Sequence, residues 1–204
     1  SFVDIFEKNR FCSKLDFYML KKAIQQIRKW IDMGMNPVNI SVNQSKIVFY
    51  HENYISEIKS LLEEYNVSGS YITLEVLEST VIEDIDMFNS ILTEVKKLGF
   101  SVSLDDFGSG YSSLNVLSKL QIDELKIDRI FLHTKSEVDN QRTKWILESI
   151  IDIAKKSQIL VVVEGVESKQ DDLFIKNLGA DIGQGYFYGR PLSISAFNDL
   201  IETK

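Results

Sequence analysis

The sequence has little cysteine or histidine and no long apolar run. Cys12 is the only cysteine among 204 residues, which excludes an internal disulfide and is typical of the reducing cytoplasm. The best apolar run, Ile159 to Val163, spans five residues, whereas a helix that crosses a bilayer needs roughly 18. We therefore expect a cytoplasmic segment without membrane contact, and a parent protein anchored elsewhere is compatible with this.

Positive charge is scarce as well. The chain has 23 lysines and arginines against 30 aspartates and glutamates, a net charge of -7, which excludes a general basic surface for a nucleic-acid polymer. The two histidines, His51 and His133, are far apart in polar surroundings, and this disfavours a histidine-rich zinc site. Any bound metal must be held mostly by oxygen, which favours Mg²⁺ or Mn²⁺.

Apolar periodicity predicts one domain over residues 1–204 in which six strands are each followed by a helix. The expected strands cover residues 38–42, 71–76, 101–104, 124–127, 159–163 and 181–186. The expected helices cover residues 14–33, 52–65, 84–98, 112–120, 140–156, 169–178 and 194–203. Such alternation indicates an α/β fold with right-handed parallel units, either an open doubly wound sheet or six-eighths of a barrel.

The stretch from Ser101 to Ser113, SVSLDDFGSGYSS, begins as a strand and ends as a glycine-rich loop. Asp105 and Asp106 fall where the strand should stop, and a bend there would let both carboxylates reach one cation or two neighbouring ones. Gly108 and Gly110 allow a sharp turn and a close approach to a ligand. This geometry suits a metal and a phosphate, although a solvated Asp-Asp turn explains the stretch equally well when it is taken alone.

The other strand ends favour the functional interpretation. They carry, in order, Asn43; Glu75 and Glu78; Asp105 and Asp106; Lys126 and Asp128; Glu164 and Glu167; and Gln184. In a parallel barrel these ends converge on one mouth, where clustered carboxylates would repel one another unless a divalent metal is bound. Lys126 alone would be an ordinary surface lysine, but two oxygen-bound metals beside one lysine predict phosphodiester hydrolysis.

The chain resembles the EAL domain family of cyclic di-GMP phosphodiesterases from its second residue to nearly its last. The resemblance is carried by six ordered segments: SVNQS at 41–45, LEVLES at 74–79, LDDFGSGYSSL at 104–114, LKIDR at 125–129, VEGVE at 163–167 and QGYFYGRPL at 184–192. It implies a TIM-barrel-like (β/α)8 domain that cuts cyclic di-GMP to linear pGpG with two Mg²⁺ or Mn²⁺ ions.

The resemblance also implies a role for each site residue. Asn43, Glu75 and Asp105 correspond to ligands of the first ion, with Asp105 as the bridge. Asp106 and Glu164 correspond to ligands of the second ion. Lys126 corresponds to the family's catalytic lysine. Glu164 corresponds to the general base as well as to a metal ligand. The supporting or ligand-contacting positions are Glu78, Asp128, Glu167 and Gln184.

Three features depart from the family pattern. The Glu-Ala-Leu motif and the first two strands of the barrel are missing, so the domain is expected to be incomplete at its N-terminus and part of a longer protein, and the chain by itself could be inactive. Leu77 replaces a threonine between Glu75 and Glu78. Val163 replaces an alanine and is expected to be tolerated as a packing variation.

Two other functions stay open on the sequence alone. One is a non-catalytic receptor for cyclic di-GMP with the same fold, and the other is a barrel hydrolase for a different phosphate ester. The resemblance further implies a homodimer and an upstream sensor or cyclase domain. The helix over residues 112–120, with Leu114, Val116 and Leu117, could form the dimer interface, although core packing explains these side chains equally well.

Overall fold

The computed structural model describes residues 11–78, 85–109, 114–132 and 137–202. These ranges belong to two compact units, unit 1 over residues 1–126 and unit 2 over residues 127–204. The predictions made for Gly110 and His133, and for the side chains of Leu114 and Val116, lie outside the described residues. The single domain over residues 1–204 stays a prediction. Among the described helices, none is both long enough and apolar enough to cross a membrane.

Unit 1 alternates strands and helices as the sequence predicts. Its elements are α2 (Phe11–Asp32), β1 (Ile40–Gln44), α3 (Lys46–Phe49), α4 (Tyr54–Tyr65), β2 (Ile72–Leu77), α6 (Ile85–Lys97), β3 (Ser101–Phe107), α7 (Leu114–Lys119) and β4 (Glu124–Ile127), whose last residue belongs to unit 2. β1, β2 and β3 pair in parallel and in sequence order, and β4 follows β3. Parallel order places all four carboxyl ends at one edge of this sheet.

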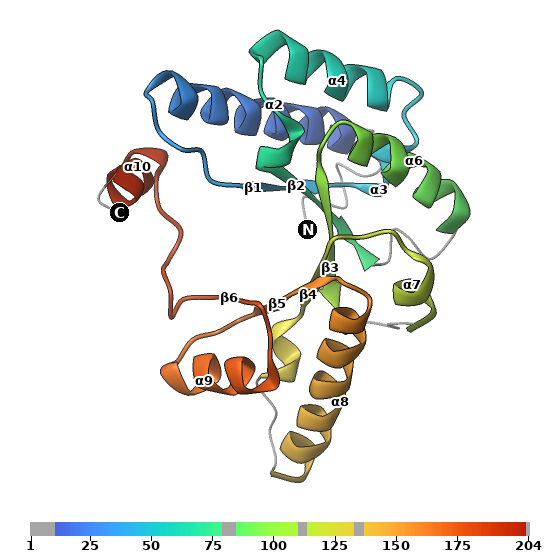
Figure 1. Cartoon of the computed structure of the whole chain (residues 1–204), viewed down its shortest axis with the longest axis vertical. Helices are drawn as coiled ribbons and strands as arrows, with labels where there is room; N and C mark the ends of the chain where they lie inside the picture. Colours follow the sequence, from blue (N-terminus) through green and yellow to red (C-terminus); the bar gives the residue numbers. More distant parts are fainter. Residues whose placement is uncertain (1–10, 79–84, 110–113, 133–136, 203–204) are drawn as a thin grey trace. The chain divides into compact units, whose positions relative to one another are not determined.

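Burial in unit 1 explains why the sheet forms here. Leu20, Ile24 and Ile27 recur at helical spacing on α2 and are fully buried, and α2 packs against β1 and α4 (Figure 1). In β2 every residue from Ile72 to Val76 is buried, as expected for a parallel strand covered on both faces. Polar side chains on β2 are therefore held inside the unit rather than in solvent.

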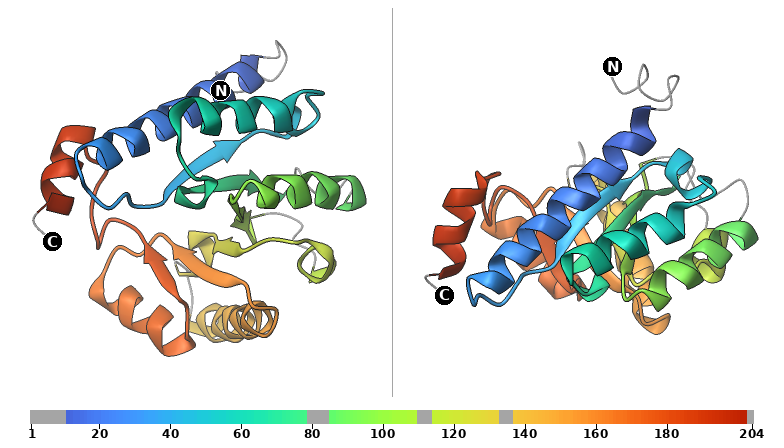
Figure 2. Two further views of the ribbon diagram at one scale, coloured as in Figure 1. Left: turned by 45° about the horizontal axis from the view of Figure 1, so that its top comes forward. Right: turned by 90° about the horizontal axis from the view of Figure 1, so that it is seen from above.

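Unit 2 contains the remaining elements. They are α8 (Glu137–Lys156), β5 (Leu160–Glu164), α9 (Lys169–Leu178), β6 (Ile182–Gln184) and α10 (Ile194–Glu202). β5 and β6 are parallel, and α8 lies beside α9 (Figure 2) and packs against β5. Val163 is fully buried in β5, which fits the expected packing variation. α9 begins with a capping box between Ser168 and Asp171, and this satisfies backbone N–H groups at its first turn.

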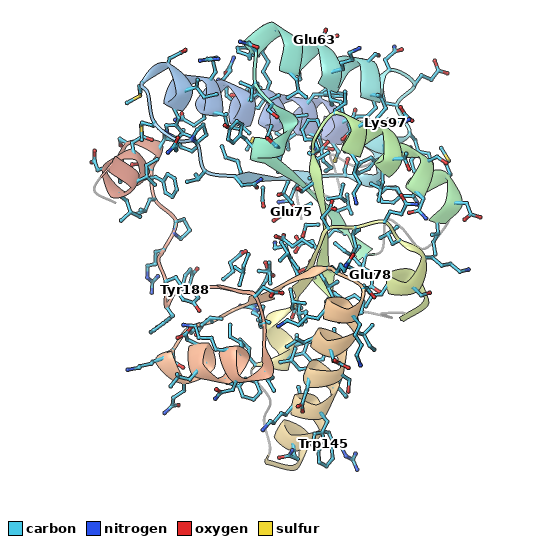
Figure 3. All side chains as sticks on the ribbon, viewed as in Figure 1. Glu63, Glu75, Glu78, Lys97, Trp145 and Tyr188 are labelled. Atoms are coloured by element: carbon cyan, nitrogen blue, oxygen red, sulfur yellow. The ribbon has the colours of Figure 1, made fainter. Side chains whose placement is uncertain are left out.

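The spacing of Ile146, Ile150 and Ile153 predicts that all three side chains face inward from α8, and this prediction is wrong for two of them. Ile150 is 7 % exposed, but Ile146 and Ile153 are 52 % and 37 % exposed. The buried face instead carries Leu147, Ile150, Ile151 and Ala154, and Trp145 lies on the outward side (Figure 3). The error arose because apolar residues fill two adjacent stripes of this helix, and periodicity alone does not say which stripe meets the sheet.

Three strand ends differ by two or more residues from the sequence prediction, and one of them is β1, which ends at Gln44 rather than at Val42. β3 continues through both aspartates to Phe107. β6 stops at Gln184 rather than at Tyr186, because the chain turns at Gly185, whose carbonyl accepts from the N–H of Tyr188 at 3.1 Å. As a result, Asn43, Asp105 and Asp106 lie within their strands rather than after them.

Candidate functional site

Three charged side chains of unit 1 form a buried cluster at the carboxyl end of the sheet. The Lys126 Nζ lies 3.1 Å from Glu75 Oε1 and 2.9 Å from Asp105 Oδ1. The three side chains, from β4, β2 and β3, are only 6 %, 9 % and 12 % exposed. Buried charges are stable only when they are paired, and the Lys126 ammonium group is shared by the two carboxylates, so it offsets one of their two negative charges. Sequence reasoning placed all three residues in the site, and unit 1 brings them into contact.

Asn43 lies beside this cluster on β1. The register of β1 and β2 pairs Asn43 with Glu75, and the register of β2 and β3 pairs Glu75 with Ser103 (Figure 3 shows Glu75 on β2). Asn43 is exposed, whereas Gln44 after it is buried. An amide oxygen next to two carboxylates extends a set of oxygen donors of the kind that Mg²⁺ and Mn²⁺ prefer.

The Asp105-Asp106 pair bends the end of β3. Asp106 has φ 57° and Gly108 has φ 97°, which is the left-handed region that aspartate tolerates and glycine favours. The Asp106 N–H donates to Asp105 Oδ1 at 3.0 Å, and the two residues each offer a carboxylate oxygen within 4.8 Å of the other. Adjacent residues of a straight strand point to opposite faces, so this bend is what allows both carboxylates to serve one ion.

Two further carboxyl groups, Glu78 and Glu124, lie on or directly after strands that carry the cluster. Glu78 follows β2 directly and is 6 % exposed. Glu124 is two residues before Lys126 on β4, so the two side chains share a face of the strand. Glu124 was not predicted as a site residue, although this spacing could have identified it. Burial raises the pKa of Glu124, and the negative charges of Glu75 and Asp105 add to the rise while Lys126 opposes it. Among the described residues of unit 1, the carboxyl groups of Glu75, Asp105 and Glu124 therefore lie around one buried lysine, Lys126.

In unit 2, backbone hydrogen bonds join the segments that carry Glu164 and Gln184. Glu164 and Gln184 are partners in the register of β5 and β6. The N–H of Val166 donates to the Gln184 carbonyl at 3.0 Å, and the N–H of Phe187 donates to the Val166 carbonyl at 3.0 Å. These hydrogen bonds join the segment after β5 to the end of β6 and the turn that follows it. The sharing of an ion between Glu164 and Asp106 stays a prediction.

Glu167 and Asp128 are engaged in local structure. The N–H of Glu167 donates to Asp171 Oδ2 at 3.1 Å, so the residue is tied to the first turn of α9. The carboxylate of Asp128 accepts from the N–H of Ile130 at 2.8 Å and caps a 3-10 turn over Arg129–Phe131. This contact fixes the turn that follows β4, and the supporting role of Asp128 in the site stays a prediction.

Tyr188, in the segment after β6, forms a hydrogen bond with Asp172 of α9. The Tyr188 hydroxyl donates to Asp172 Oδ1 at 2.5 Å, and Lys176 Nζ lies 2.9 Å from the same carboxylate. The hydrogen bond from Tyr188 and the charge of Lys176 lower the pKa of Asp172, while the carboxylate raises the pKa of Tyr188 to about 12. A Cβ at Gly183 would collide with the Tyr188 hydroxyl, so only glycine leaves room for this contact.

Sequence reasoning also missed a buried carboxylate, Asp16, which contacts the residue that follows β1. Asp16 accepts hydrogen bonds from both the N–H and the hydroxyl of Ser45, at 3.0 and 2.5 Å. Asp16 precedes Leu20 by four residues and thus lies on the apolar stripe of α2. A carboxylate in line with that stripe was the signal that could have identified it.

Comparisons with known proteins extend over most of the chain. A sequence model of the EAL domain matches residues 1–191. The bifunctional diguanylate cyclase/cyclic di-GMP phosphodiesterase MucR of Pseudomonas aeruginosa is 34 % identical over 191 residues, which cover 94 % of this chain and 28 % of that protein. The cyclic di-GMP phosphodiesterase NbdA of the same species is 32 % identical over 200 residues, which cover 98 % of this chain and 25 % of that protein. The chain spans under a third of the length of either relative.

Solved structures give the same result for the fold. The PaMucR phosphodiesterase in complex with c-di-GMP is similar with a TM-score of 0.86 and 33 % identity, over 96 % of this chain and 78 % of that one. The EAL enzyme Bd1971 with cAMP and cyclic di-GMP bound is similar with a TM-score of 0.88 and 28 % identity, over 98 % of this chain and 55 % of that one. The predicted α/β, TIM-barrel-like fold is confirmed.

Proposed function

Because the chain belongs to the EAL domain family, we propose that it is a metal-dependent phosphodiesterase that hydrolyses cyclic di-GMP to linear pGpG. The observation that carries the proposal is the buried contact of Lys126 with Glu75 and Asp105. A desolvated ammonium group at the carboxyl ends of parallel strands is placed to stabilise the charge that develops when a phosphodiester is cleaved.

The donor set of unit 1 fits a hard divalent cation. We propose that Asn43, Glu75, Asp105 and Asp106 hold Mg²⁺ or Mn²⁺, with Glu164 as a further ligand. These donors are all oxygen atoms, as such ions require. When bound, the ions would act as Lewis acids toward phosphoryl oxygens.

The protein's own residues would handle the proton and the charge. Glu164 is proposed to accept a proton from the attacking water, whose oxygen bonds to phosphorus while the bond from phosphorus to the leaving ribose oxygen breaks. The leaving oxygen takes up a proton from solvent and Glu164 returns its proton to solvent, so one water is consumed for each linear product. Lys126 would stabilise the negative charge on the leaving oxygen. Glu78, Asp128, Glu167 and Gln184 are proposed to support these groups or to contact the ligand.

Chromatography of cyclic di-GMP after incubation with Mn²⁺ and the protein, extended by the upstream strands that the family resemblance implies, tests this function. We expect pGpG to appear, and Glu164→Gln to abolish it, because the amide cannot accept the proton. Glu148→Gln is the matched control, since this exposed glutamate lies on α8 of the same unit. Turnover that survives in Glu164→Gln would remove Glu164 from the chemistry, and intact cyclic di-GMP with the unsubstituted protein would refute the enzyme.

A receptor for cyclic di-GMP is the second candidate. It is favoured by Leu77, which ends β2 opposite Asp105 and places an apolar side chain where the family usually carries a threonine hydroxyl. Binding of cyclic di-GMP in the presence of EDTA, together with no pGpG when Mn²⁺ is restored, is the result expected of a receptor. Binding that requires the metal, followed by turnover, is the result expected of the enzyme.

We further propose a cytoplasmic location, because Cys12 is the only cysteine and no long apolar run occurs in the sequence. The family resemblance supports the further proposal of a homodimer and an upstream sensor or cyclase domain. Among the α7 side chains that are described, Leu117 is the one apolar residue, and it is 5 % exposed, so it offers little to a partner. Light scattering of the purified protein at increasing concentration would test the dimer.

A further inference from the structure

A buried polar cluster lies directly behind Asn43 in unit 1. It joins α2, α4 and the end of β1 through Asp16, Gln44, Ser45 and Tyr54. Asp16 Oδ2 accepts from the Ser45 N–H at 3.0 Å and from its hydroxyl at 2.5 Å. The Tyr54 hydroxyl donates to Gln44 Oε1 at 3.1 Å, and Gln44 Nε2 donates to the backbone carbonyl of Asn43 at 2.9 Å. We call these four residues the Asn43 clamp.

The clamp is set in the core rather than on the surface. Asp16, Gln44 and Tyr54 are 9 %, 3 % and 2 % exposed. Phe49 packs against the Tyr54 ring with centroids 5.2 Å apart, so the tyrosine itself is fixed. Burial raises the pKa of Asp16, and the hydrogen bonds from Ser45 oppose that rise. Buried polar groups that are paired in this way hold one geometry, because breaking any pair leaves a costly unsatisfied group.

Asn43 needs such support more than its neighbours do. It lies on β1, which pairs with β2 alone among the described strands, and its side chain is exposed. Glu75, by contrast, is buried between two strands and contacts Lys126. The backbone just after Asn43 is therefore fixed by the clamp, while the register with β2 fixes the residue from the other side.

We infer that Asp16 and Ser45 are positioning residues, which hold Asn43 in the orientation needed to bind a divalent cation. The inference rests on the proposed function, in which Asn43 is a metal ligand. Residues that orient a ligand from behind commonly change metal affinity by about 10- to 100-fold when they are substituted. Neither Asp16 nor Ser45 is required to touch the ion itself.

Direct binding of Mn²⁺, measured from the electron paramagnetic resonance signal of the free ion, tests this without relying on activity. We expect Ser45→Ala and Asp16→Asn each to raise the Mn²⁺ dissociation constant by about 10-fold. Ser45→Thr keeps the hydroxyl and should bind as the unsubstituted protein does. Tyr65→Phe is the matched control, because it removes a part-buried 2.9 Å hydrogen bond between α2 and α4 that lies away from Asn43. It should leave Mn²⁺ binding unchanged.

A double-mutant cycle with Asn43→Ala separates positioning from general stability. If the clamp acts through Asn43, Ser45→Ala should not weaken Mn²⁺ binding further once Asn43 is removed. Additive losses in the double variant, or unchanged affinity in Ser45→Ala, would overturn the inference. Should Asp16→Asn fail to fold, the Ser45 variants alone decide. If the unsubstituted protein binds no Mn²⁺, the metal site fails, and this inference fails with it.

Discussion

The two units hold their predicted site residues by different means. In unit 1, Glu75, Asp105 and Lys126 are buried and ion-paired at 2.9 and 3.1 Å. In unit 2, Glu164 is half-buried and Gln184 is exposed, and backbone hydrogen bonds join their segments. The arrangement in unit 1 depends on the balance of buried charges in a medium of low dielectric constant. The arrangement in unit 2 depends on hydrogen bonds between backbone groups.

This difference indicates which substitutions each unit should tolerate. Removing one charge from a buried pair exposes the full desolvation cost of its partner. Where backbone groups make the contacts, the identity of the side chain matters less. We therefore expect charge changes in the buried cluster of unit 1 to lower stability strongly, and side-chain changes around the unit 2 segments to lower stability less.

Lys126→Met should have the largest effect on stability. The substitution leaves Glu75 and Asp105 buried without a cation, which we expect to lower the free energy of unfolding by about 3–5 kcal/mol in EDTA. Turnover of cyclic di-GMP should fall by about 10²- to 10³-fold through the lost stabilisation of charge. Urea unfolding and chromatography of pGpG measure the two effects, and added Mn²⁺ should restore part of the stability.

Lys97→Met is the control for this prediction. Lys97 is paired with Glu94 at 2.7 Å, but its side chain is 65 % exposed on the outside of α6 (Figure 3). A surface pair contributes about 1 kcal/mol or less, so stability and turnover should barely change. Similar losses in the two variants would show that burial does not distinguish the triad from a surface pair.

Leu147→Ala and Ile146→Ala compare two neighbouring residues of α8 in unit 2. Leu147 is fully buried and Ile146 is 52 % exposed. We expect Leu147→Ala to lower the free energy of unfolding by about 2–5 kcal/mol through the cavity it leaves. Ile146→Ala should change it by about 0.5 kcal/mol or less. Chemical denaturation measures both, and a reversed order would restore the inward face that the sequence predicted.

Tyr188→Phe should lower the melting temperature near neutral pH by a smaller amount, because Asp172 loses its hydroxyl donor. The pKa of Asp172 is lowered in the folded protein, so this stabilisation is present above the ordinary aspartate pKa of 3.8 and is lost as pH falls through the folded value. The pKa of Tyr188 is raised from 10.0 to about 12, so its contribution is present below pH 10.0 and is lost as pH rises through about 12.

The melting temperatures of the unsubstituted protein and Tyr188→Phe should therefore converge in acid and in strong alkali. Tyr186→Phe is the matched control, since it keeps the aromatic ring that lies 4.6 Å from the Arg190 guanidinium. A difference between the unsubstituted protein and Tyr188→Phe that does not vary with pH would assign the effect to packing.

Leu77→Thr should have the smallest effect on stability. Leu77 ends β2 opposite Asp105 and is 43 % exposed, so the free energy of unfolding should change by about 0.5 kcal/mol or less. Turnover of cyclic di-GMP, measured beside it, decides whether the missing hydroxyl matters to the reaction. A large loss of stability would show that Leu77 packs in a way that its exposure does not reveal.

The sequence by itself determined the order of strands and helices and most of the candidate site. Strand and helix periods are local properties of the chain, and each strand end is marked by a change from apolar to polar residues. Parallel connection then places those ends at one edge. Asn43, Glu75, Asp105 and Lys126 could be grouped in this way without coordinates, and the family resemblance assigned their roles.

Only the tertiary structure decided which side chains meet across elements. The Asp16–Ser45 contact joins residues 29 positions apart, and the Tyr188–Asp172 contact joins residues 16 positions apart. Such pairs depend on the packing of one element on another, and no local pattern encodes that packing. The same reason explains α8, where two apolar stripes were available and only contact with β5 and α9 selected the buried one.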